Sequence, residues 1–163
     1  MIFKTGNILE CDEYAIIQQV NCMDRMGSGL AKAIYTKWPK VKKEFHRLWK
    51  QNAGKYLFGT IQVVELPGKI VINAYSQYSY GYDGALYTNY QAAWQCFTQA
   101  LAVMDEICID QIAIPYNYGC GLGGGDWAIV SETIDEVFGD RAVIYKLEDD
   151  NAKNNDGTMD RIY

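Results

Sequence analysis

The segment of the sequence with the clearest chemistry is residues 117–127, NYGCGLGGGDW, which contain five glycines. An apolar run at 112–115 precedes this segment and an amphipathic pattern follows it, so it is expected at a strand-to-helix junction. Glycines at such a junction let backbone N–H groups converge on an anion without obstruction by Cβ atoms, and the start of the helix adds a partial positive charge. The segment is therefore interpreted as a phosphate cradle.

Two better-known phosphate motifs do not fit this segment. No Lys-Ser or Lys-Thr pair follows the glycines, as a Walker loop requires, and no G-x-G-x-x-G motif follows the first expected strand. A glycine-rich turn with Asp126 as the N-cap of the next helix is the alternative interpretation.

A second junction of the same kind lies at residues 20–31, VNCMDRMGSGLA, where an apolar run leads into Gly27-Ser28-Gly29 and then into a helical pattern. In an open α/β sheet, ligands bind beyond the carboxyl ends of the strands, so two such loops face one another across a crevice. Two anion cradles in one small domain indicate a ligand with a diphosphate.

The elements that must position these loops alternate along the chain. Short β-branched apolar runs at 15–20, 60–66, 70–74, 112–115 and 142–147 predict strands. Helical spacing predicts helices over 90–104 and 127–137, and a third helical region that begins near Leu30 and is interrupted at Pro39. This alternation predicts a three-layer α/β/α fold with a mixed, mostly parallel sheet and helices on both faces.

The composition suits one domain over residues 1–148, followed by a polar, acidic tail at 149–163. The start of the chain does not resemble a signal peptide, no long apolar run occurs, and five scattered cysteines indicate a reducing compartment. These features predict a cytoplasmic protein without a membrane partner. The formal net charge of −5 predicts no direct affinity for nucleic acid in the absence of a strong local basic patch.

The succession TGNIL, VNC-MDR-MGSGLA and IPYNYGCGLGGGDW resembles the macro domain family over nearly all of residues 1–147. The sequence is most similar to small bacterial and phage proteins described as ADP-ribose 1″-phosphate phosphatases. That branch also includes the terminal ADP-ribose protein glycohydrolase and an antitoxin that removes ADP-ribose from DNA. The resemblance implies binding of ADP-ribose or ADP-ribose 1″-phosphate, with an ADP-ribosylated macromolecule as a further partner and with no cofactor or metal.

The resemblance also implies which residues bind the ligand. One side of the diphosphate would be lined by Gly27, Ser28, Gly29 and Leu30, and the other by Asn117, Tyr118, Gly119, Cys120, Gly121 and Leu122. The family's Gly-Asp-Ile motif, whose acidic residue contacts the adenine amino group, reads Gly6-Asn7-Ile8 here, and Asn7 offers an uncharged carbonyl acceptor. Tyr145 and Leu147 are candidates to flank the adenine or, equally, to belong to the core.

Two activities are consistent with this resemblance: hydrolysis of ADP-ribose 1″-phosphate or an ADP-ribosyl linkage, and non-catalytic capture of ADP-ribose as a reader, sensor or sponge. For hydrolysis, Asp24 is the candidate general base, with Asn21 beside it near the distal ribose. The lysine and aspartate of the glycohydrolase relatives correspond to Gln77 and Gly123, which argues against their covalent mechanism.

Several other side chains have a weaker case for a role in the site. His46 lies in the basic segment KVKKEFHRLWK and is expected on a solvated helix face. Asp126 reaches the site only if the glycine loop folds it inward. One or two tyrosines of the segment 75–90 are expected to touch the ligand.

Overall fold

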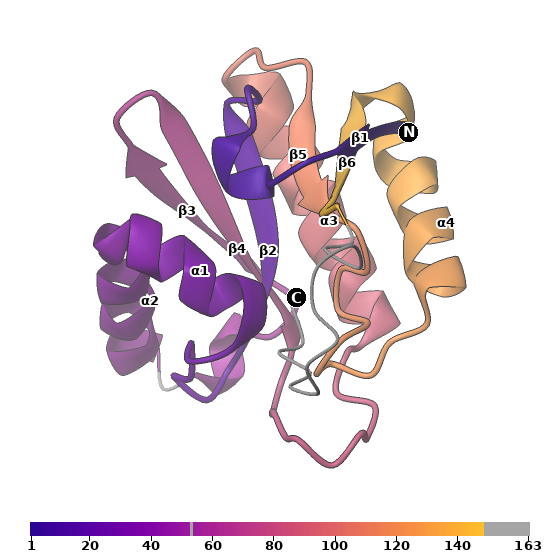
Figure 1. The fold of residues 1–163 in the computed structure, drawn as a ribbon. Helices are drawn as coiled ribbons and strands as arrows, with labels where there is room; N and C mark the ends of the chain where they lie inside the picture. Colours follow the sequence, from indigo (N-terminus) through magenta and orange to yellow (C-terminus); the bar gives the residue numbers. More distant parts are fainter. Residues whose placement is uncertain (53, 149–163) are drawn as a thin grey trace, which may run out of the picture.

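The protein is described by a computed structural model over residues 1–52 and 54–148. A single six-stranded sheet forms its centre, with helices on both faces (Figure 1). The strands are β1 (Ile2–Thr5), β2 (Ala15–Asn21), β3 (Ile61–Leu66), β4 (Lys69–Gln77), β5 (Ile112–Pro115) and β6 (Ala142–Lys146). The helices are α1 (Gly29–Lys37), α2 (Pro39–Asn52), α3 (Tyr90–Glu106) and α4 (Trp127–Phe138), with short 3-10 turns at Ile8–Glu10, Lys55–Leu57 and Gly139–Arg141.

The strand order is β1-β6-β5-β2-β4-β3, and only β3 runs antiparallel to its neighbour. This topology confirms the predicted mixed, mostly parallel α/β sheet. The expected tail at 149–163 lies outside the described residues. No helix of the described part is long and apolar enough to cross a membrane.

The first residues of strand β2, Ala15 to Ile17, show why consecutive residues of one strand can all be apolar. Ile17 packs into the cluster beneath α3 and α4, together with Phe97. Its neighbour Ile16 packs into the cluster beneath α1 and α2, together with Phe45. Successive side chains of a strand point to opposite faces, and helices cover both faces, so neither face needs polar residues.

The observed elements differ from the predicted ones at two places, Pro39 and β1. Pro39 takes the first position of α2, where its missing N–H costs no hydrogen bond, so the interrupted helical region is two helices. Strand β1 was not expected from the sequence. It is a four-residue edge strand whose side chains are all exposed, so its sequence shows no alternation of apolar and polar residues. Only its hydrogen-bonded pairing with β6 identifies it as a strand.

A buried carboxylate fastens β1 to the rest of the sheet. The Glu13 side chain is 3% exposed; it accepts a hydrogen bond from Lys4 Nζ at 2.8 Å and another from the Tyr145 hydroxyl at 2.7 Å. Burial raises the pKa of Glu13, but these two hydrogen bonds outweigh burial and hold the pKa below its ordinary value. The ionised carboxylate thus links β1, the turn before β2, and β6.

This contact predicts an acid-sensitive contribution to stability. Because the pKa of Glu13 is lower in the folded chain, its contribution is present above the unfolded value of about 4.3 and is lost as pH falls through the folded pKa. Urea unfolding at a series of pH values should show a smaller loss of stability between about pH 5 and 3 in Glu13→Gln than in the wild type. Glu10→Gln, which removes an exposed carboxylate paired with Lys37, should retain the wild-type pH dependence. Parallel profiles for Glu13→Gln and the wild type would contradict the assignment.

Candidate functional site

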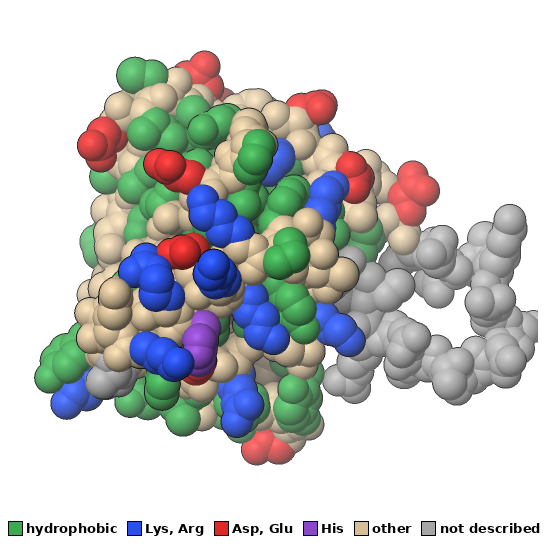
Figure 2. All heavy atoms as spheres, turned by 90° about the vertical axis from the view of Figure 1, so that its left-hand side faces the viewer, with side chains coloured by type: hydrophobic (Ala, Val, Ile, Leu, Met, Phe, Trp, Pro, Cys, Tyr) green, Lys and Arg blue, Asp and Glu red, His purple; other side chains and the backbone are tan. Residues whose placement is uncertain are grey.

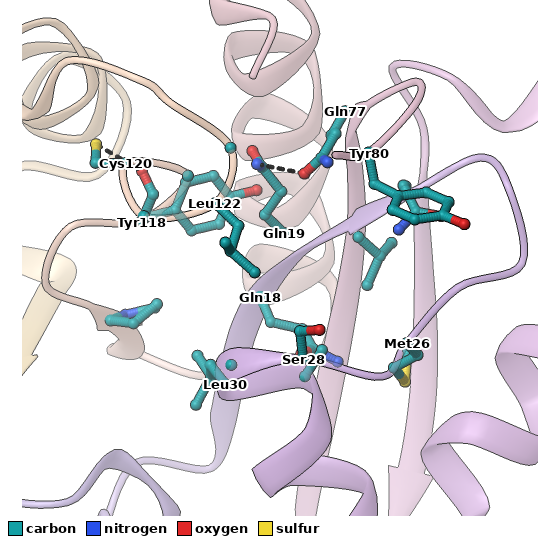
Figure 3. Close-up of a pocket in the computed structure, with 18 of the residues that line it drawn as sticks. Gln18, Gln19, Met26, Ser28, Leu30, Gln77, Tyr80, Tyr118, Cys120 and Leu122 are labelled. Atoms are coloured by element: carbon teal, nitrogen blue, oxygen red, sulfur yellow. Dashed lines mark hydrogen bonds between the residues drawn. The ribbon is translucent and has the colours of Figure 1, made fainter. Parts of the chain in front are cut away.

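A pocket of about 530 Å³ lies at the carboxyl ends of β2, β4 and β5 (Figure 3). We call residues 22–28 the first loop, residues 116–126 the second loop and residues 78–89 the tyrosine loop. Figure 3 shows Ser28 and Leu30 on one side of the pocket and Tyr118 and Leu122 on the other. The two glycine-rich junctions therefore face one another, as the sequence predicted.

Most of the expected ligand-binding residues line this pocket, together with Asn21, which was expected to take part in catalysis. They are Asn21, Gly27, Ser28, Gly29, Leu30, Asn117, Tyr118, Gly119, Cys120, Gly121 and Leu122. Tyr80 and Tyr82 of the tyrosine loop also line it, and the Tyr82 hydroxyl lies 2.8 Å from Ser28 Oγ. Two tyrosines of that segment thus reach the site.

The other expected ligand-binding residues, Asn7, Ile8 and Tyr145, do not line the pocket and have other contacts. Asn7 Oδ1 accepts a hydrogen bond from the Leu9 N–H at 3.0 Å and caps a 3-10 turn, so the carbonyl expected to meet adenine is engaged. Ile8 is buried in the core, and the Tyr145 hydroxyl bonds to Glu13. A ligand role for these residues stays a prediction.

Asn21 shapes the first loop. Its Oδ1 accepts hydrogen bonds from the backbone N–H groups of Met23 (3.0 Å) and Arg25 (3.3 Å), and its Nδ2 donates to the Arg25 carbonyl at 2.8 Å. These bonds close a turn in which Asp24 has a φ of 55°, a left-handed conformation that aspartate tolerates better than most residues. Asn21 is therefore committed to the loop backbone in this structure.

Asp24 lies outside the pocket lining and pairs with His46 Nδ1 on α2. His46 is exposed, as expected for a solvated helix face, although the sequence did not indicate its acidic partner. The Asp24 carboxylate is therefore directed towards α2. Its role as general base stays a prediction, and it requires this pair to open.

The second loop is held by a polar network that reaches it from β2 and from the end of the tyrosine loop. Thr88 Oγ1 donates to the Gly119 carbonyl at 2.6 Å and accepts from Gln19 Nε2 at 2.8 Å. The Gly123 carbonyl accepts from the N–H groups of Tyr87 and Thr88. A Cβ atom at Gly123 would lie 2.5 Å from the Gly119 carbonyl oxygen, so this backbone leaves no room there for the aspartate of the glycohydrolase relatives.

Asp126 and Cys120 have structural contacts. Asp126 Oδ1 accepts from the Ala128 N–H at 2.9 Å, which confirms the N-cap interpretation. Burial and the nearby negative charge of Asp126 raise the pKa of the Cys120 thiol to about 11, so it is protonated at neutral pH. Neither side chain supplies a base to the pocket.

A ladder of amide side chains from β2, β4 and β3, which ends at the pocket, is the part of the site that sequence reasoning missed. Gln62 Nε2 donates to the Glu44 carbonyl, Asn73 Nδ2 donates to Gln62 Oε1, and Gln18 Nε2 donates to Asn73 Oδ1. Because the Glu44 carbonyl can only accept, it fixes the amide orientation of Gln62, and each amide then fixes the next one along the ladder. Gln18 Oε1, at the pocket end, is left as a buried acceptor with no partner among the described residues. Polar residues inside the apolar run 15–20 are the signal that could have revealed this ladder.

The pocket offers an anion many neutral donors. Its lining contains no carboxylate, imidazole or lysine, and Arg25 is its only permanent charge among the described residues. Gln77, at the position of the relatives' lysine, uses its Oε1 to accept from Gln19 Nε2 at 2.9 Å. The arrangement suits binding of a phosphorylated ligand better than acid–base chemistry on it.

Comparison with known proteins agrees with this geometry. Residues 17–134 match the family described as Macro domain. The chain belongs to the macro domain family. The DNA ADP-ribosyl glycohydrolases of Mycobacterium tuberculosis and Mycobacterium bovis are each 25% identical to this macro domain over 146 residues, or 83% of this chain. The chain spans 38% of the length of those two relatives.

Solved structures show the same fold. The macrodomain of Mycobacterium tuberculosis DarG has a TM-score of 0.75 and 26% identity, with 88% of this chain and 95% of that chain covered. The macrodomain of Thermus aquaticus DarG has a TM-score of 0.74 and 20% identity, with coverage of 91% and 97%. Thermosipho africanus DarTG in complex with ADP-ribose has a TM-score of 0.74 and 18% identity, with coverage of 90% and 42%.

The tight contact at Gly123 predicts an asymmetry between two neighbouring glycines. Gly123→Ala must displace Thr88 or the Gly119 carbonyl and should destabilise the domain by about 1–3 kcal/mol. Gly121→Ala meets nothing within 4 Å and should unfold within about 0.5 kcal/mol of the wild type. Urea unfolding of both variants measures the difference, and equal stabilities would show that the second loop is not constrained in this way.

Proposed function

We propose that this macro domain binds the ADP-ribosyl group, with the diphosphate held between the first and second loops. The observation that carries the proposal is the uncapped start of α1. Ser28 occupies the N-cap position but makes no side-chain cap bond; its hydroxyl lies instead within hydrogen-bond distance of Tyr82. The N–H groups of the first helical turn lack intrahelical partners and carry the positive end of the helix dipole, which suits an anion.

The second loop supplies matching donors. The N–H groups of Gly121, Leu122 and Gly123 donate no hydrogen bond within the described part of the chain, and these residues line the same pocket. Two sets of donors across a cavity of this size suit a diphosphate with a sugar on each side. Thermosipho africanus DarTG, which has the same fold, is described as a complex with ADP-ribose.

The distal ribose is proposed to lie near Asn21, on the side of the pocket towards Asp24, as the family resemblance implies. Arg25, whose carbonyl accepts a hydrogen bond from Asn21 Nδ2, lines the pocket beside it. The anomeric carbon of the distal ribose would then lie beside Arg25, and a group attached to that carbon would extend out of the pocket there.

The cradle can be tested through its backbone donors. Leu30→Pro removes one N–H in the first turn of α1, where proline is tolerated. Proline disfavours a right-handed helical conformation in the residue before it, but Gly29 has a φ of 53° and is not in that conformation. Leu30→Ala removes the same side chain and keeps the N–H. Calorimetry should show ADP-ribose affinity about tenfold weaker in Leu30→Pro than in Leu30→Ala, because a charge-assisted hydrogen bond is lost.

Circular dichroism of both variants should match the wild type. Equal affinities of the two folded variants for ADP-ribose would contradict phosphate binding at the α1 N-terminus. Absence of ADP-ribose binding by the wild type would contradict the proposed function itself.

Hydrolysis at the anomeric carbon is the second candidate function, favoured by the two DNA ADP-ribosyl glycohydrolase relatives. The substrate would be ADP-ribose 1″-phosphate or an ADP-ribosylated macromolecule. Since the described pocket lining lacks a base, the Asp24–His46 pair beside Arg25 is the acid–base group proposed to act, after it opens towards the ligand. A described lining without a carboxylate, imidazole or lysine favours capture without turnover, so the two candidates make opposite predictions for a turnover assay.

Turnover assays separate them. We expect ADP-ribose 1″-phosphate to be bound, and any release of phosphate to fall at least about a hundredfold in Asp24→Asn, because the general base is lost. Asparagine tolerates the left-handed backbone at this position, so the variant should fold. Glu44→Gln on α2 should leave turnover unchanged. Tight binding by the wild type with no phosphate release, and no release of ADP-ribose from a modified oligonucleotide, would establish a binding module.

A further inference from the structure

The charges of this acidic protein are strongly segregated. Residues 25–55 contain nine of the fifteen lysines and arginines, and Glu44 is their only acidic residue. The nine are Arg25, Lys32, Lys37, Lys40, Lys42, Lys43, Arg47, Lys50 and Lys55, and all are exposed. We call them the basic surface. Figure 2 shows these cations gathered around the single histidine on the face formed by α1 and α2.

This surface is mostly unneutralised. Among the described residues, only Lys37 and Arg47 of the nine form ion pairs, with Glu10 and Glu44. The expectation of no affinity for nucleic acid rested on the absence of a strong local basic patch. The helices α1 and α2 supply such a patch, so the condition attached to that expectation is not met.

A group of exposed aromatic rings adjoins the basic surface and the first loop: Lys55 Nζ lies 4.8 Å from the centre of the Tyr56 ring, and the Tyr82 hydroxyl lies 2.8 Å from Ser28 Oγ. Its members are Tyr56, Phe58, Tyr78, Tyr80 and Tyr82, which we call the aromatic rim. Tyr56 is 69% exposed and Tyr82 is 71% exposed. Two edge-to-face pairs, Phe58 with Tyr78 and Tyr80 with Tyr82, order part of the rim and leave ring surface in solvent. Exposed aromatic faces are the usual platforms on which unpaired bases stack.

The first loop joins both groups to the mouth of the pocket. On the α2 side, Trp49 Nε1 donates to the Cys22 carbonyl at 2.8 Å, and His46 pairs with Asp24. On the other side, the Cys22 N–H donates to the Tyr78 carbonyl at 2.9 Å. Arg25, which belongs to the basic surface, lines the pocket itself. Cations and aromatic rings therefore lie together at the place where a group attached to the anomeric carbon of the proposed ligand would extend out of the pocket.

We propose that the basic surface and the aromatic rim together hold a single-stranded nucleic acid, whose ADP-ribosylated nucleotide places its ADP-ribosyl group in the pocket. The inference rests on the proposed function, because the pocket must accept ADP-ribose for the strand to be positioned. Cations track the phosphates and aromatic rings stack on unpaired bases; this combination distinguishes a single strand from a duplex, whose bases are already stacked.

Fluorescence anisotropy with an unmodified, mixed-sequence single-stranded DNA of about twelve nucleotides tests the surface without needing the modified substrate. The wild type should bind this probe, with affinity falling steeply as salt rises. Lys43→Gln combined with Lys50→Gln removes two charges from one face of α2 and should weaken binding about tenfold, with a salt slope smaller by about two. Lys146→Gln on β6 removes the same kind of charge elsewhere and should have little effect.

Tyr56→Ala should weaken single-strand binding about fivefold or more, through lost stacking, and should leave the affinity for a hairpin duplex unchanged. ADP-ribose affinity by calorimetry should be the same in every one of these variants, since none touches the pocket lining.

The failures of the two proposals can be told apart. Wild-type protein that binds ADP-ribose but not the single strand overturns the surface proposal alone, and binding to vesicles rich in phosphatidylserine without oligonucleotide binding assigns the cations to a membrane instead. Equal affinities for single strand and duplex, with no effect of Tyr56→Ala, also overturn it. Loss of ADP-ribose binding overturns the proposed function, whatever the anisotropy shows.

Discussion

The Thr88 hydroxyl donates to the Gly119 carbonyl at 2.6 Å and accepts from Gln19 Nε2 at 2.8 Å, and much of the site depends on this contact. It joins β2, the end of the tyrosine loop and the second loop at one point. Because Gly119 and Gly123 lie against these atoms without a Cβ, the second loop is held by its carbonyl groups. Residues 121–123 line the pocket, and their N–H groups donate no hydrogen bond within the described part of the chain. Binding capacity therefore resides in the backbone, and close packing excludes a catalytic side chain at position 123.

The first loop is organised by the same principle with different atoms. Asn21 uses both ends of its amide on the loop backbone, and Asp24 is turned towards His46. In this structure the side chains predicted to do chemistry, Asn21 and Asp24, are therefore bonded to other protein groups, while Gly29 and Leu30 at the uncapped helix start line the pocket. A pocket built in this way attracts an anion by dipoles and one arginine, and its lining contains no carboxylate among the described residues.

Charge is arranged on a larger scale by the packing of α1 and α2. Their apolar faces cover the sheet with residues such as Ile34 and Phe45, so their lysines are displayed together on the outside. The acidic residues lie almost entirely elsewhere in the chain. A protein with a net charge of −5 thereby carries one strongly cationic face, and Arg25 of that face lines the pocket.

The sequence by itself determined most secondary structure and the location of the two glycine junctions. Apolar periodicity, Pro39, and the cap at Asp126 act over a few residues, so local patterns were enough to recognise them. The tertiary structure decided which polar side chains were already engaged. Asn7 is a local cap, but the partners of Asp24, Gln18 and Glu13 lie in other elements. Only folding brings such partners together, because their pairing depends on sheet order and helix packing and leaves no periodic trace in the chain.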